Sequence, residues 1–159
     1  MRKSRLAGVL AATACAVLAV GVSVAQAGDA GAQHRGRTAT FIVVEHADTD
    51  TVVDVGPHGD SIGDTLAFGN PVYDTHGSRV GSDQGSCVRT KVGKAWECSW
   101  TTTLNGGSLV VQGPYYDAAD STLAITGGTG KWREARGQMR LHALDAKGSA
   151  YDFTFLVEH

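Results

Sequence analysis

The feature that most constrains this chain is a series of short apolar runs with β-type alternation, separated by glycine- and asparagine-containing turn signals. The runs cover residues 38–46, 51–55, 64–73, 79–91, 94–105, 108–116, 121–126, 137–144 and 150–158. No segment keeps a helical period of 3.6 residues, and residues 132–136 are expected to form one helical turn at most. About eight strands with short links predict an all-β domain, either an eight-stranded antiparallel up-and-down β-barrel or a sandwich.

Composition agrees with a domain rich in tight turns. The 159 residues are 42% hydrophobic, which is enough for one core, and include 21 glycines but only 3 prolines. Glycines without prolines or a repeat indicate turns between strands, not collagen or a flexible linker. The net charge of -2 offers no basic patch, so nucleic acid is not an expected partner.

The first 27 residues have the pattern of a secretory signal peptide. Arg2, Lys3 and Arg5 precede an apolar stretch that ends in the small-x-small sequence of residues 25–27. We therefore expect a secreted, extracellular protein, with a loose tail at 28–37, a domain at 38–159 and no membrane association after cleavage. The other interpretation is an uncleaved membrane anchor.

Cys87 and Cys98 are expected to form a disulfide, because an even pair of cysteines in an oxidising compartment usually does. Val92-Gly93 is a candidate two-residue turn between two strands. Pairing Lys91 with Lys94 across this turn places the two cysteines directly opposite each other, at the spacing that a disulfide needs. The other interpretation is a redox pair or metal site, although no redox spacing or nearby histidine is present.

Several motifs resemble the allene oxide cyclase barrel family, and some are shared with the related dirigent proteins. They are GDTLAFGNPVY at 63–73, a glycine-flanked strand at 81–87, VQGPY at 111–115, LAITGGTG at 123–130 and ARGQ at 135–138. The resemblance implies an eight-stranded barrel and a homotrimer. It also implies closure of a ring from an unstable fatty-acid epoxide. We expect no cofactor and no metal, because His46 and His142 without a third ligand do not make a metal site. The family's site has a shaped apolar cavity, a first-strand carboxylate and polar groups that hold a water.

We assign candidate catalytic roles to Glu45, on the first strand, and to Asn70, which matches a water-holding asparagine of the family. A one-residue slip in register would exchange Glu45 between the lumen and the outer wall, and Asn70 is also a plausible turn residue before Pro71. Cys87 matches a lumen cysteine of the plant cyclases. The candidate ligand-binding residues, each of which could instead be structural, are His46, Tyr73, Arg89, Trp100 and Tyr115.

Two functions from different classes follow from these observations. In the first, the barrel binds a small hydrophobic intermediate and steers its cyclisation or coupling through cavity shape and at most one acid. In the second, it is a lipocalin-like carrier that holds a small apolar ligand without changing it. A packed barrel with a surface interaction role is a third, less specific possibility.

Overall fold

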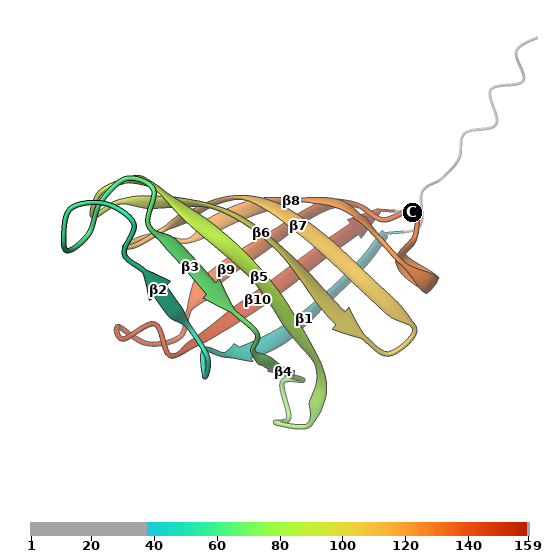
Figure 1. Ribbon diagram of the computed structural model, residues 1–159. Helices are drawn as coiled ribbons and strands as arrows, with labels where there is room; N and C mark the ends of the chain where they lie inside the picture. The colour runs from blue at the N-terminus through green and yellow to red at the C-terminus, as the bar shows by residue number, and fades with distance from the viewer. Residues whose placement is uncertain (1–37, 159) are drawn as a thin grey trace, which may run out of the picture. The chain divides into compact units, whose positions relative to one another are not determined.

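The computed structural model describes residues 38–158, which form a closed antiparallel β-barrel (Figure 1). The predicted signal peptide and tail lie outside the described residues. The elements are β1 (Thr38–His46), β2 (Thr51–Val53), β3 (Thr65–Phe68), β4 (Pro71–Tyr73), β5 (Arg79–Lys91), β6 (Ala95–Leu104), β7 (Gly107–Tyr116), β8 (Ser121–Gly128), the 3-10 helix η1 (Gly130–Trp132), β9 (Arg136–Ala143) and β10 (Ala150–Glu158). Among these residues no helix has the length and hydropathy that a membrane crossing needs.

The ten strands occupy eight positions around the ring, which confirms the predicted eight-stranded barrel. The order is β2-β3-β5-β4-β1-β10-β9-β8-β7-β6, and pairing of β5 with β6 closes it. β4 pairs with β1 while β3 pairs with β2, and both β3 and β4 pair with β5. Each of these two ring positions is therefore one strand with an interruption, at residues 47–50 in one and 69–70 in the other.

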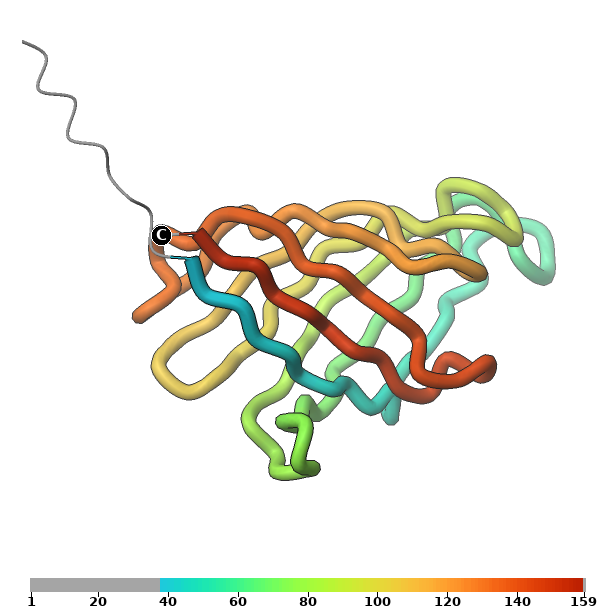
Figure 2. Tube along the Cα trace, turned by 180° about the vertical axis from the view of Figure 1, so that it is seen from behind, coloured from blue at the N-terminus to red at the C-terminus, as the bar shows by residue number. Residues whose placement is uncertain are grey.

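The first and last strands lie side by side, as Figure 2 shows. Along β10 the buried side chains alternate with less buried ones, starting from Tyr151 and ending at Val157. Because neighbouring positions of a strand face opposite sides of the sheet, this alternation puts the aromatic and aliphatic residues of β10 inside the barrel. The hydrophobic core is thus the barrel interior.

Aromatic rings fill one end of the interior. Phe41 stacks on Trp132 of η1 with ring centroids 5.3 Å apart, and on Phe155 with centroids 5.0 Å apart. The η1 turn joins β8 to β9 and brings Trp132 over this end, where the ring is buried. Any interior space must therefore lie toward the other end, where the β5–β6, β7–β8 and β9–β10 turns are found.

The predicted disulfide is present, and the predicted pairing of its two strands is confirmed at the cysteines. Cys87 faces Cys98 with a Cα–Cα distance of 4.0 Å, and Arg89 faces Trp96. The predicted turn was wrong in detail, because Lys91 pairs with Ala95 and not with Lys94. The connection gains one residue through a register shift after Arg89, and Gly93 adopts the left-handed conformation with φ of 62°.

Replacing both cysteines by alanine is expected to lower the free energy of unfolding by about 3 kcal/mol, because a cross-link that closes a short loop restricts the unfolded chain by roughly that amount. Urea denaturation of the oxidised wild type and the double variant measures the difference. A Ser86→Ala, Ser99→Ala double variant, which alters the neighbouring exposed pair on the same strands, is the matched control. Equal midpoints for wild type and the cysteine variant would contradict the expectation.

Candidate functional site

The barrel interior holds a cavity of about 60 Å³. The side chains that line it are mostly aromatic or aliphatic, together with the disulfide, and its titratable lining carboxyls within residues 38–158 are those of Glu45 and Asp50. The aromatic lining residues are Phe68, Trp100, Tyr115, Tyr151 and Phe153. The cavity is therefore an apolar chamber with one acidic wall.

Glu45 points into the barrel because of its place in the alternation of β1. Val43 and Glu45 are buried, whereas Ile42 and His46 are exposed on the outer face. The exposed fraction of Glu45 is 5%, and its Oε1 accepts a hydrogen bond of 2.7 Å from Nδ2 of Asn70. Of the two interpretations of this residue, the structure favours the lumen position over the outer wall.

Asn70 links the two interrupted strands of the barrel. Its Oδ1 accepts hydrogen bonds from the backbone N–H and the hydroxyl of Thr49, both 3.0 Å long. Its Nδ2 donates to Glu45 and to Oδ1 of Asp50, each at 2.7 Å. An amide side chain has two donors and can accept two bonds at its oxygen, so all four positions are used. Asn70 therefore orients the carboxylates and has no free group for a ligand.

Asp83 lies behind Glu45 and completes a buried acidic cluster. It exchanges two backbone hydrogen bonds with Asn70, of 3.0 and 2.9 Å, and its exposed fraction is 1%. Burial, followed by the charge of Asp83, raises the pKa of Glu45 to about 9 against the opposing effect of the Asn70 hydrogen bond. Burial likewise raises the pKa of Asp83 to about 7, although the hydrogen bond from Glu45 lowers it. The direction of this shift favours the protonated form of Glu45 at neutral pH.

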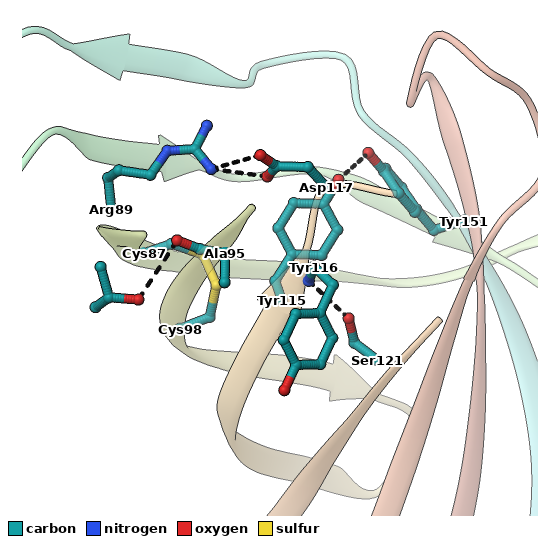
Figure 3. The surroundings of a disulfide bond; sticks show 10 residues. Cys87, Arg89, Ala95, Cys98, Tyr115, Tyr116, Asp117, Ser121 and Tyr151 are labelled. Atoms are coloured by element: carbon teal, nitrogen blue, oxygen red, sulfur yellow. Dashed lines mark hydrogen bonds and ion pairs between the residues drawn. A yellow bond between two sulfur atoms is a disulfide. The ribbon is translucent and has the colours of Figure 1, made fainter. Parts of the chain in front are cut away.

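Two tyrosines close the cavity on the side of the β7–β8 and β9–β10 turns. The hydroxyls of Tyr115 and Tyr151 are 3.0 Å apart, and their rings meet edge to face (Figure 3). Burial is the largest cause of a raised pKa for both hydroxyls. Both are therefore neutral groups that can donate a hydrogen bond as well as accept one.

The sequence of the barrel matches the allene oxide cyclase family model over residues 39–156. The chain belongs to the allene oxide cyclase family. Among solved structures it is similar to a pyocyanin demethylase, with 27% identity, a TM-score of 0.64, and coverage of 74% of this chain and 99% of that one.

Two more distant solved structures share the fold of this allene oxide cyclase family member. One is a pterocarpan synthase dirigent protein, with 18% identity, a TM-score of 0.64, and coverage of 78% of this chain and 86% of that one. The other is an exo-specific intermolecular Diels-Alderase, with 11% identity, a TM-score of 0.64, and coverage of 78% and 98%.

In this member of the allene oxide cyclase family, three of the predicted ligand-binding residues do not reach the cavity. His46 packs on Tyr73, with ring centroids 4.6 Å apart, and His46 is exposed on the outer face. The parity that turns Glu45 inward necessarily turns His46 outward. Trp100 and Tyr115, in contrast, line the cavity, and ligand binding by them stays a prediction.

Arg89 is the third, and its guanidinium is already occupied. Nη1 donates to both carboxylate oxygens of Asp117, at 2.8 and 2.7 Å (Figure 3). Nε lies 2.6 Å from Oδ1 of Asp60. The guanidinium carbon also lies 3.9 Å from the ring centroid of Trp96. Arg89 therefore ties the loop between β2 and β3 to the β7–β8 turn.

Sequence reasoning missed Asp50, Asp83 and Tyr151. The alternation of β5 carries a usable signal for Asp83, since it is an even number of residues from Cys87 and shares its face. Tyr151 likewise shares the inward face of Phe153 on β10. Within residues 38–158, no group of three or more His, Cys, Asp or Glu side chains is arranged to hold a metal ion.

Proposed function

We propose that this barrel binds a small hydrophobic molecule in its lumen and steers its cyclisation or coupling, with Glu45 as the acid. The observation that carries the proposal is a buried carboxyl, held by Asn70, on the wall of an aromatic cavity. A carboxyl whose pKa lies above neutral can donate a proton or a strong hydrogen bond to an oxygen on which negative charge develops.

The arrangement favours one mode of action. Aromatic walls restrict a flexible unsaturated molecule to a few conformations, and this restriction lowers the entropic part of the barrier to ring closure. Glu45 then stabilises the developing charge from a fixed position, because Asn70 holds its Oε1. Asp83 acts through Glu45, since its charge raises the pKa of the acid. Asn70 and Asp83 are thus positioning residues.

The structural relatives support a role in small-molecule chemistry. Their names describe a demethylase of pyocyanin, a dirigent protein that is a pterocarpan synthase, and a Diels-Alderase. All act on small molecules, and two of the three names refer to synthesis or cycloaddition. Secretion is part of the proposal as well, and the Cys87–Cys98 disulfide supports it because such bonds persist in oxidising compartments.

A carrier function is the second candidate. The saturation of Asn70 favours it, because the group that would hold a water near a substrate is fully engaged within the protein. A carrier needs only the apolar walls and one hydrogen-bond donor, and both are present.

Native mass spectrometry of the secreted protein, purified from its own host, identifies a bound molecule, and the host's small-molecule extract is then incubated with purified protein. Glu45→Gln is expected to slow formation of the protein-dependent product by about 10²–10⁴-fold, as loss of a positioned acid does. Glu97→Gln, on the exposed face of β6, is the matched control and should act like wild type. Identical products with and without protein would contradict a cyclase, and tight retention of an unaltered molecule would favour the carrier.

A further inference from the structure

A second, larger chamber lies directly outside the tyrosine pair. Its volume is about 290 Å³, several times that of the inner cavity. The β7–β8 and β9–β10 turns and the adjoining parts of β7, β9 and β10 form its walls, and five of the twelve lining residues have small side chains. Those small wall residues are Ala118, Ala119, Ala143, Ala146 and Gly148.

The two chambers share one wall. Tyr115, Leu141 and Tyr151 line both of them. The hydroxyls of the two tyrosines are hydrogen-bonded to each other (Figure 3), so the shared wall includes this bonded pair. Tyr115 belongs to β7 and Tyr151 to β10, which are not neighbours in the ring. A side chain at Gly148, which adopts φ of 66°, would collide with the Tyr151 hydroxyl, so glycine leaves room for that ring.

This partition can open at modest cost. The link is a single hydrogen bond of 3.0 Å between two neutral hydroxyls, and such a bond is a weak net restraint in water. No other side-chain hydrogen bond to either hydroxyl is present within residues 38–158. A ligand group that accepts and donates hydrogen bonds would replace the bond it breaks.

The two chambers are lined by carboxyl groups and, among the described residues, by no Lys, Arg or His. The charged ones are Asp50, Asp117, Asp120 and Asp145, and Glu45 adds a neutral acid. Two basic side chains bond to lining carboxylates, Arg89 to Asp117 and His142 to Asp120, each at 2.7 Å. An anionic ligand would therefore lose its hydration without meeting a cationic group among the lining residues.

We propose that the two chambers form one binding site for an uncharged or cationic ring molecule, and that the site excludes anionic molecules such as fatty acids. The inner cavity of about 60 Å³ is small for a ring system, since an apolar cavity that binds benzene has a volume of about 150 Å³. The ring system lies in the outer chamber, and its polar end passes the parted tyrosines to reach Glu45. This inference rests on the proposed function only in taking the lumen as the ligand site.

Three fluorescent probes of one size test the charge selection. They are acridine, which is uncharged at pH 8, an aminoacridine cation, and the acridine carboxylate anion with its substituent on the central ring. We expect the first two to bind the disulfide-bonded protein about tenfold or more tightly than the anion. Equal or tighter binding of the anion, or no binding of the neutral and cationic probes, would overturn the proposal.

Paired variants test the outer chamber. Ala119→Trp fills it from the β7–β8 turn and is expected to weaken binding of the aminoacridine about tenfold or more. Ala124→Trp, on the exposed face of β8, is the matched control and should change binding less than about twofold. Tyr115→Phe removes the hydroxyl pair and should speed association several-fold. Equal affinities of the two tryptophan variants would exclude the chamber.

The Glu45→Gln variant separates this inference from the proposed function. If acridine binding survives that substitution and still responds to Ala119→Trp, the two-chamber site holds whether or not Glu45 acts as an acid. If Ala119→Trp has no effect while Glu45→Gln abolishes product formation, the two-chamber inference fails and the proposed function stands.

Discussion

Replacement of Asn70 by alanine is expected to lower the free energy of unfolding by about 3–5 kcal/mol. The side chain has an exposed fraction of 1% and makes four hydrogen bonds, two of them to carboxyls. Alanine would leave the Thr49 N–H without its acceptor and would bring Glu45 and Asp50 together without the donor between them. Removing one partner from a buried polar group costs far more than the net value of the bond, because the other partner stays desolvated.

Urea denaturation at pH 7 measures this loss, and Asn105→Ala provides the matched control. Asn105 is exposed in the β6–β7 turn, so its replacement should change stability by less than about 0.5 kcal/mol. Amide hydrogen exchange gives a second readout, since faster exchange should concentrate at β2 and β3, whose link to β1 passes through Asn70. Similar stabilities for the two variants would show that the contacts linking β1 to β2 and β3 do not depend on the Asn70 amide.

The strand pattern predicted the barrel because its signals are local. Alternation, glycine turns and the cysteine register each need only neighbouring residues or one hairpin, and the pairing of Cys87 with Cys98 followed from simple counting. The exact turn did not follow from this counting. A bulge after Arg89 pairs Lys91 with Ala95 but leaves the pairing of Cys87 with Cys98 unchanged, so the cysteines give no signal for it. Pro71 indicated that the strand is interrupted near Asn70. It did not indicate which residues the Asn70 side chain contacts.

The site was less predictable because its residues meet only when the ring closes. Glu45 and Asp83 lie on strands that are not neighbours in sequence, and β1 contacts β4, not β5. A single sequence indicates which residues of each strand face the lumen. It does not indicate which of these residues from different strands lie opposite one another across the lumen. Asn70 could therefore be singled out from its motif, whereas its contacts with two carboxyls depend on three separate segments.

Glu45→Gln is expected to abolish most of the stability change between pH 7 and 9. The pKa of Glu45 is raised from its ordinary value of 4.5 to about 9, so this residue's contribution is most favourable below pH 4.5 and is lost as the pH rises toward 9. Asp83, with a pKa of about 7, ionises before most of this window. For each pH unit in which Glu45 is ionised in the unfolded chain but protonated in the folded one, the free energy of unfolding falls by about 1.4 kcal/mol. Between pH 7 and 9 the wild type should therefore lose about 2 kcal/mol of this free energy.

Denaturation curves at pH 7, 8 and 9 check this expectation, with Glu97→Gln as the control that should follow wild type. Exposed groups such as His142, whose pKa is raised by Asp120, contribute equally to all three proteins and cancel in the differences. Glutamine keeps the acceptor for Asn70, so the comparison isolates the proton. A wild-type curve parallel to that of Glu45→Gln would mean that Glu45 is already ionised at pH 7. In that case the cavity would hold a carboxylate, which could act as a base but not as the acid proposed here.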